Sequence, residues 1–297
     1  MSGAYFPRIQ TVTGALPVSE IDGPVLPHEH LRTDTRWGIG VDSDPARWLD
    51  EERYVLAEIK DLGRVRELGL VVEHSCVGMA RDPAALARIS MGARVPIVAA
   101  TGFAAQPFAG AAITRYGVDD LTADLLHEIG AGLDGTGARP GVIVAASWDE
   151  TPTPAEERAV TAAARASLRT DLPMAAGGLE LLELLLSQNV PAQRLSAPGA
   201  DTPAQRKIAE TGAYVSVSCA EDVLTLLDAG HAERILVSSG VRLREHLAGY
   251  GGQGYGRLFS SVVPALRAAG VDDGTLRLVT RDNPVRWLTA GQGRLAA

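Results

Sequence analysis

Apolar residues along the chain follow two alternating patterns. Short apolar runs are typical of buried strands, and the stretches between them carry apolar residues three and four positions apart, as helices do. Glu51 to Leu68 illustrates the second pattern, with Val55, Ile59, Leu62 and Val65 on one face. Eight segments are predicted to be strands: residues 25–30, 70–76, 96–101, 141–147, 172–176, 194–197, 213–218 and 234–238.

Helical patterns fall between these predicted strands. The rhythm of strand and helix predicts an α/β fold, a TIM-type (β/α)8 barrel with its active residues at the carboxyl ends of the strands. A doubly wound open sheet is the alternative, but no G-x-G-x-x-G turn follows the first strand. The helices are predicted at residues 51–68, 83–92, 119–130, 154–169, 179–187, 203–211 and 221–227.

The rhythm continues without a break in composition, so we expect one domain over residues 1–297. Residues 1–24 are predicted to be an irregular lead-in, because glycines and prolines interrupt them. With 46% hydrophobic and 22% charged residues, the chain resembles ordinary globular proteins. A net charge of -8 without a Lys/Arg cluster argues against nucleic acid or an anionic membrane as partner. We expect a small-molecule substrate, and a second copy of the chain, in a homodimer, is a further candidate partner.

The two cysteines, Cys76 and Cys219, lie far apart and form no CxxC pair. This spacing favours a reducing compartment over a disulfide framework. No signal-peptide pattern opens the sequence, and no apolar run approaches the length of a membrane span. We therefore expect a cytoplasmic protein.

The first predicted strand ends in His28-Glu29-His30. Alternation along a strand places His28 and His30 on one side, where they could share a metal ion or a substrate, or form a hydrogen-bonded structural pair. Two ligands are too few for a zinc site, so other residues must complete one. Three other histidines, His127, His231 and His246, fall in predicted helices or beside them and are expected at the surface.

Several sequence stretches resemble the phosphotriesterase-like branch of the amidohydrolase superfamily. The resemblance implies an amidohydrolase-like barrel and metal-dependent hydrolysis of phosphotriesters, lactones and related esters. It spans nearly the whole chain. The matching stretches are Thr11-Val12-Thr13-Gly14, Leu26 to His30, Gly78-Met79-Ala80-Arg81-Asp82, Ile97 to Phe103, Gly132 to Gly137, Ala162 to Ser167 and Asn283 to Leu288.

The chain departs from this family at the metal ligands. The resemblance implies two metals held by the His-x-His pair, a carboxylated Lys or a Glu on strand four, one His each on strands five and six, and an Asp on strand eight. His28 and His30 match the pair. The other four positions fall on Ala145, Gly177, Gly199 and Gly240, whose side chains cannot coordinate a metal. We therefore expect no binuclear centre and no metal cofactor.

Three functions remain open for the emptied site. In the first, His28 or His30 acts as a general base without metal, in an elimination, cyclisation, isomerisation or simple hydrolysis. In the second, one zinc ion stays on His28 and His30 with new ligands from Glu73, His74 or Cys76. In the third, the barrel is a non-catalytic binder or partner subunit. We favour the first, because the His-x-His pair persists where the other ligands have become Ala or Gly.

The candidate site residues lie at or near predicted strand ends. The catalytic candidates are His28, His30, Glu73 and His74. For Glu73 a structural carboxylate is an equal alternative, and alternation lets only one of Glu73 and His74 face the barrel interior. The candidate substrate-binding residues are Asp34, Cys76, Phe103, Trp148, Asp201 and Cys219.

Overall fold

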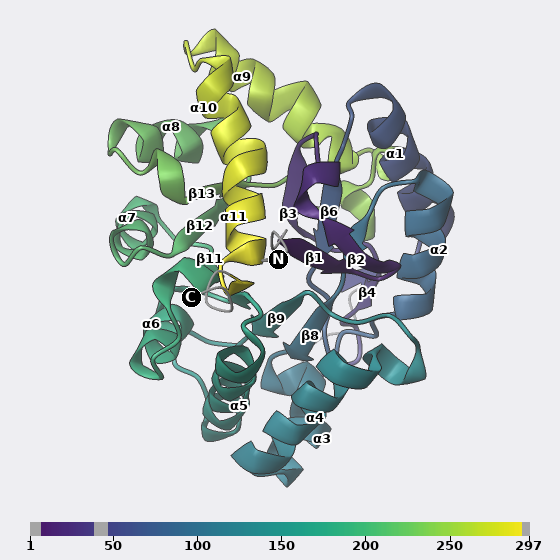
Figure 1. Cartoon of the computed structure of the whole chain (residues 1–297), viewed down its shortest axis with the longest axis vertical. Helices are drawn as coiled ribbons and strands as arrows, with labels where there is room; N and C mark the ends of the chain where they lie inside the picture. Colours follow the sequence, from purple (N-terminus) through teal and green to yellow (C-terminus); the bar gives the residue numbers. More distant parts are fainter. Residues whose placement is uncertain (1–6, 39–46, 293–297) are drawn as a thin grey trace, which may run out of the picture.

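Eight parallel strand positions form a ring in the computed structural model, which describes residues 7–38 and 47–292 (Figure 1). Three strands pair in the order β3-β6-β7, and six pair in the order β13-β12-β11-β10-β9-β8. This arrangement confirms the predicted α/β barrel. The strands are β3 (Val25–Glu29), β6 (Leu70–Glu73), β7 (Ile97–Val98), β8 (Ala100–Phe103), β9 (Val142–Ala145), β10 (Met174–Ala176), β11 (Leu195–Ala197), β12 (Tyr214–Val217) and β13 (Ile235–Val237).

The third strand position is shared by β7 and β8. The sequence predicted one strand over 96–101, but Ala99 interrupts it: β7 pairs with β6 on one side and β8 with β9 on the other. The strand also runs on to Phe103, which bridges Val77. Gly102 allows this path, because its φ of +122° and its contact with the backbone of Val144 exclude a side chain.

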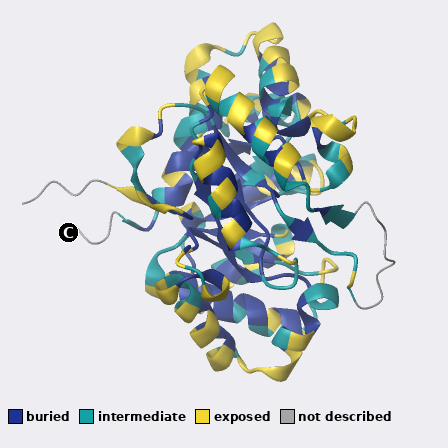
Figure 2. Cartoon of the chain, turned by 90° about the vertical axis from the view of Figure 1, so that its right-hand side faces the viewer, coloured by how far each residue is buried: buried dark blue, intermediate teal, exposed yellow. Residues whose placement is uncertain are grey.

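Helices surround the ring, with their buried faces toward the strands and their exposed faces outward (Figures 1 and 2). None of the described helices is long and apolar enough to cross a membrane. The helices that follow the strands are α1 (Glu52–Val65), α2 (Pro83–Ala93), α3 (Gln106–Arg115), α4 (Val118–Ala131), α5 (Pro154–Thr170), α6 (Leu179–Ser187), α7 (Thr202–Glu210) and α8 (Ala220–Asp228).

Side-chain caps fix where several helices begin. Thr153 and Glu156 form a reciprocal capping box at the start of α5, ahead of Pro154. Asp82 accepts a hydrogen bond from a backbone amide in the first turn of α2, and Asp201 does the same for α7. The cap at Asp201 starts α7 soon after the end of β11, whereas longer loops precede α2 and α5.

The prediction of an irregular lead-in over residues 1–24 is wrong for the residues that the structure describes. β1 (Arg8–Thr11) and β2 (Gly14–Pro17) form an antiparallel hairpin, whose turn uses Gly14 with a φ of +128°. The strands are too short to show a clear alternation, so their glycines and prolines resembled a loop. Residues 1–6 lie outside the described residues.

One end of the barrel is closed by the hairpin and the last helix. After β13 come α9 (Val263–Ala268), α10 (Asp273–Arg277) and α11 (Asn283–Thr289). α11 crosses in front of the strands in Figure 1, beside the hairpin. Its Trp287 is fully buried and packs with Ile9 and strand residues such as Val72. Its indole Nε1 donates to the carbonyl of Arg194 at 3.1 Å. The interior is therefore filled from this end, which leaves the opposite end for a site.

The sequence analysis did not predict the C-terminal helices α9, α10 and α11. Other differences concern further unpredicted elements and the limits of predicted ones. α3 was not predicted, because its small and polar residues give only a weak amphipathic pattern. α1 ends at Val65 rather than Leu68, and β6 ends at Glu73, so Cys76 lies beyond the strand. The polar loop after His30 carries a small pair of strands, β4 (Thr33–Asp34) and β5 (Trp48–Leu49).

The side chain of Glu29 joins the first and last strands of the ring. β3 and β13 belong to different hydrogen-bonded sheets, so no regular ladder closes the barrel here. Oε1 of Glu29 accepts from the backbone amides of Ser239 at 2.6 Å and Gly240 at 3.1 Å, and Oε2 accepts from that of Val241 at 2.6 Å. The amide of His30 donates to the carbonyl of Val241 at 2.9 Å. One fully buried carboxylate thus replaces part of a strand ladder.

We predict that Glu29→Gln destabilises the protein strongly. The side-chain NH2 group of glutamine would face backbone N–H groups, which are also donors. Buried N–H groups would then lack an acceptor, which lowers the free energy of unfolding by about 3 kcal/mol. Urea denaturation measures this change. The control Glu210→Gln, at an exposed helix end, should stay within about 0.5 kcal/mol of wild type. An equally small effect of Glu29→Gln would contradict this role.

Candidate active site at the barrel mouth

The carboxyl ends of the strands open on a polar cavity of about 190 Å³. Active sites of barrel enzymes lie at this end of the strands. His28, near the end of β3, lines the cavity and is half-buried. The other polar side chains in its wall come from the segments around β11, β12 and β13: Gln205, Ser216, Ser218, Asp222, Ser238 and Arg242.

Three histidines form a layer at the mouth. The rings of His28 and His74 are stacked, with centroids 3.9 Å apart and planes 13° from parallel. Nε2 of His74 lies 2.9 Å from the carbonyl of Pro27, so this nitrogen carries the proton and donates. The ring of His30 meets that of His28 edge-on at 6.1 Å. The expectation that His28 and His30 share one end of the barrel is met, with His74 as the wall behind His28.

Hydrogen bonds fix the orientation of His28 and His30. The backbone amide of His28 donates to Oγ of Ser238 at 2.8 Å, and Nδ1 of His28 lies 3.5 Å from Oγ of Ser216. Nδ1 of His30 lies 2.9 Å from Oγ of Ser75. No hydrogen bond to Nε2 of His28 is made within residues 7–38 and 47–292, so this nitrogen is available to a ligand.

The environment favours neutral imidazoles. Burial, with His74, His30 and Arg242 nearby, lowers the pKa of His28 well below its ordinary value. Burial and the neighbouring His30 lower the pKa of His74 to about 3. Two stacked neutral rings avoid charge repulsion. At neutral pH His28 therefore presents an unprotonated nitrogen that accepts a hydrogen bond or a proton.

Glu73 holds backbone and does not reach the cavity, so the prediction of a catalytic Glu73 is corrected. Its side chain is fully buried. Oε1 accepts from the backbone amide of Ser75 at 2.8 Å, and Oε2 accepts from that of Leu31. Oε1 also lies 3.8 Å from Nδ1 of His30. Of a catalytic and a structural role for Glu73, the structure agrees with the structural one. Both carboxylate oxygens accept hydrogen bonds that position the chain after β3 and β6.

The four positions expected to lack metal ligands surround the mouth. Ala145 ends β9 and is buried, and Gly177 directly follows β10 with room for a side chain. At Gly199, a Cβ would lie 2.6 Å from the backbone nitrogen of Gln205. Gly240 has a φ of +77°, and its Cβ would lie 3.2 Å from that of Ser218. The backbone at Gly199 and Gly240 is therefore built for glycine.

The remaining donors do not fit a two-metal centre. The carboxylates nearest the histidines, Glu29 and Glu73, are occupied by backbone amides. No cluster of three or more His, Cys, Asp or Glu suited to a metal ion occurs among the residues that the structure describes. His28 and His30 alone supply two of the ligands that a zinc ion needs.

The predicted substrate-binding residues are scattered. Asp34 pairs with Arg36 at 2.7 Å, which lowers the pKa of the carboxyl. Phe103 is buried in the core. Trp148 is 46% exposed and packs edge-on against Phe108, away from His28. Asp201 caps α7 and is exposed. The structure thus does not bring these residues together, because strand-end position alone does not fix where a loop side chain points.

The two cysteines differ in environment. Cys76 is fully buried with Sγ 3.9 Å from Sδ of Met79, and burial raises the pKa of its thiol to about 12. It has no exposed surface with which to contact a substrate, which corrects that prediction. Cys219 is half-buried at the start of α8, where burial also raises its pKa.

Apart from His28, sequence reasoning missed the polar side chains in the cavity wall, among them Gln205 and Arg242. Gln205 lies inside a predicted helix and has no distinguishing pattern. Arg242 follows the last strand closely, and the rule that active residues lie at strand ends could have identified it. Ser216 and Ser238 were placed within predicted strands without a role. The polar character of the mouth comes largely from these four residues.

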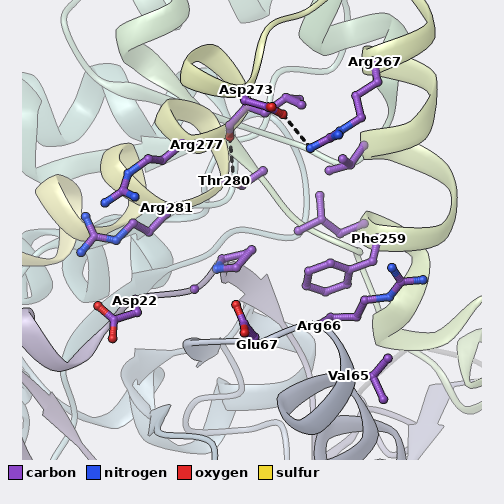
Figure 3. Close-up of a pocket in the computed structure, with 15 residues that line it drawn as sticks. Asp22, Val65, Arg66, Glu67, Phe259, Arg267, Asp273, Arg277, Thr280 and Arg281 are labelled. Carbon is purple, nitrogen blue, oxygen red and sulfur yellow. Dashed lines mark hydrogen bonds and ion pairs between the residues drawn. The ribbon is translucent and has the colours of Figure 1, made fainter.

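A larger cavity, of about 470 Å³, lies at the opposite end of the barrel (Figure 3). Its wall includes residues that precede β3 and β6, among them Asp22 and Glu67, and arginines from the C-terminal helices. Arg267 pairs with Asp273 at 2.7 Å, and Arg281 donates to the carbonyl of Ile21. These two arginines are thus engaged within the fold. The mouth, where His28 lies at the carboxyl ends of the strands, is the candidate active site.

Comparison with known proteins identifies related barrels. A sequence model described as the phosphotriesterase family matches residues 7–201 and 206–288. The phosphotriesterase homology protein of Escherichia coli (strain K12) is 28% identical over 288 residues, covering 89% of this chain and 97% of that protein. The N-acetyltaurine hydrolase of Mus musculus is 25% identical over 344 residues, covering 95% of this chain and 98% of that protein.

A solved structure confirms the likeness of the fold. The crystal structure of the Escherichia coli phosphotriesterase homology protein, complexed with phosphate in its active site, has a TM-score of 0.84 and 26% identity. The superposition covers 90% of this chain and 99% of that chain. The amidohydrolase-like barrel expected from the sequence is therefore confirmed.

We predict that the two thiols react at very different rates. At about pH 8, iodoacetamide should modify Cys219 in the folded protein while Cys76 stays unmodified, because only exposed thiolate reacts. Mass spectrometry of peptides from a time course measures both rates, and a urea-unfolded sample, in which the two thiols should react alike, is the control. Equal rates in the folded protein would show that Cys76 reaches solvent.

Proposed function

Because the chain belongs to the phosphotriesterase family, we propose that it is a hydrolase-type enzyme whose chemistry is carried by the side chain of His28 without a metal ion. The substrate is a small molecule bound in the cavity at the barrel mouth. A relative named N-acetyltaurine hydrolase supports the hydrolase type, and the ligand positions of this chain support the absence of metal.

The observation that carries the proposal is the position of His28. Its imidazole lines the cavity, its ring is held from behind by His74, and its Nε2 has no partner among the described residues. A general base needs an unprotonated nitrogen within reach of the substrate and a fixed ring orientation. His28 combines these properties, whereas His30 and His74 are buried and hydrogen-bonded.

The proposed step is a proton transfer. In a simple hydrolysis, Nε2 of His28 takes a proton from water as its oxygen bonds to the acyl carbon, and the imidazolium returns that proton to the leaving group as the bond to it breaks. In an elimination, cyclisation or isomerisation, the same nitrogen takes a proton from the substrate and delivers it to the leaving group or to another atom. His28 ends each cycle unprotonated, so no further reactant is needed.

The neighbouring groups position the base and polarise the site. Nδ1 of His28 carries the proton when Nε2 is unprotonated, and Oγ of Ser216 can accept a hydrogen bond from it before and after the ring becomes charged. Arg242 brings positive charge to the rim, where it stabilises developing negative charge on an oxygen. His74 supports the ring by stacking, and Ser238 holds the backbone. No step of this scheme passes through a metal.

We predict that His28→Ala lowers turnover by a factor of about a hundred to ten thousand, the usual effect of losing a general base. His30→Ala should lower turnover less, because His30 contacts His28 only through the edge of its ring. The substrate for this assay is the best turned over in a panel of small lactones and 4-nitrophenyl esters. The measurement is kcat in the presence of a strong chelator, with circular dichroism to verify folding.

The matched controls are His127→Ala and His231→Ala, which lie outside the mouth. Both should retain wild-type turnover. Wild-type turnover in folded His28→Ala would place the chemistry elsewhere, and turnover that the chelator abolishes would favour the single-zinc alternative.

A further inference from the structure

The side chain of Gln205 is buried at the mouth with an unused acceptor. Only 5% of the residue is exposed, and Oε1 has no hydrogen-bond partner among the described residues. The residue also lines the cavity that contains His28. A buried acceptor without a donor costs free energy, so proteins rarely keep one unless a ligand or water completes it. The position of Gln205 therefore points to a donor on the bound molecule.

Gln205 also occupies the space that a side chain at position 199 would fill, where the family resemblance expects a histidine ligand. A Cβ on Gly199 would lie 2.6 Å from Cγ of Gln205. The family match is interrupted over residues 202–205, which are the first turn of α7 and include this glutamine. The amide side chain of Gln205 thus fills the place beside Gly199. This replacement suits recognition of a substrate by hydrogen bonding rather than by coordination.

Charges of opposite sign line the two sides of the same cavity. Asp222 belongs to the first turn of α8, after β12, and Arg242 follows β13. Because β11, β12, β13 and β3 follow one another around the ring, Gln205 and Asp222 form one side, and Arg242 and His28 form the other. The wall of one cavity thus carries acceptors and a cation, together with the hydroxyls of Ser216 and Ser218.

We propose that the mouth selects a small molecule of amino-acid size that carries an oxyanion for Arg242 and an N–H or O–H donor for Gln205 and Asp222. This inference rests on the proposed function in taking the His28 cavity as the substrate site. The cavity of about 190 Å³ is below the range usual for drug-sized ligands, which agrees with a small substrate. Binding in this direction brings the atoms next to the oxyanion to His28.

The test compares three probes that share a chain of three carbons: β-alanine, propionate and propylamine. β-Alanine carries both groups, whereas each of the others lacks one. Isothermal titration calorimetry with wild-type protein should show that β-alanine binds at least about tenfold more tightly than either, because each missing group leaves a polar partner unpaired. Equal affinity for β-alanine and propionate would overturn the donor assignment, and no binding of β-alanine would overturn the proposal.

Two variants test the residues. Gln205→Leu should weaken β-alanine binding by about tenfold or more and, because it removes an unpaired buried oxygen, should raise Tm of the free protein by roughly 2 °C. A glutamine with a purely structural role would lower Tm on replacement. Arg242→Gln should weaken binding of β-alanine and propionate alike, by about tenfold. The control Arg169→Gln, on the exposed C-terminal turn of α5, should leave binding unchanged.

The outcomes separate this inference from the proposed function. β-Alanine binding that depends on Gln205 and Arg242, with wild-type turnover in His28→Ala, would uphold the ligand class and reject the proposed function. Turnover that depends on His28, with wild-type β-alanine affinity in Gln205→Leu and Arg242→Gln, would uphold the proposed function and overturn the ligand class.

Discussion

The structure depends on how one buried carboxylate closes the barrel. Pro27 has no N–H for the strand ladder, and the register between β3 and β6 shifts between Leu26 and Glu29. Glu29 makes up for these lost ladder hydrogen bonds at the other edge of β3. Its carboxylate accepts hydrogen bonds from three backbone amides that follow β13. Burial raises the pKa of Glu29 to about 7, although the hydrogen bonds from these amides lower it. Burying the carboxylate is therefore costly in free energy, and the three amides stabilise it. Closing the ring in this way fixes His28 and His30 on either side of Glu29.

The same constraint determines which groups are available for chemistry. The carboxylate oxygens of Glu29 and Glu73 accept hydrogen bonds from backbone amides. His30 and His74 are buried behind His28, which faces the cavity. Trp287 lies below, 6.4 Å from the ring of His74, so the barrel interior beneath the histidines is filled. Among the histidines that the structure describes, His28 is the one that lines the cavity at the mouth. At Gly199 and Gly240, where the sequence comparison expects metal ligands to be missing, the backbone itself requires glycine, because Gln205 and Ser218 pack against these positions.

Much of the fold could be predicted from the sequence, because apolar periodicity and helix caps are local signals. The strand and helix segments from Val25 to Val237 were located to within a few residues, and the helix α3 and the N-terminal hairpin were missed because their patterns are weak. The histidine pair could be found from its spacing. The partners of Glu73, the burial of Cys76 and the orphan oxygen of Gln205 could not, because each depends on which distant segment packs against the residue. In the His28-Glu29-His30 motif the spacing points to the histidines, but the carboxylate of Glu29 is the group that closes the barrel.

We propose that the mouth of this family member is a hydrogen-bonding pocket and not a two-metal centre. Its most direct test is elemental analysis of protein produced with zinc, manganese and cobalt in the medium and then desalted. We expect well under one equivalent of these metals per chain, since His28 and His30 lack further ligands among the described residues. A content of about two equivalents per chain would contradict it.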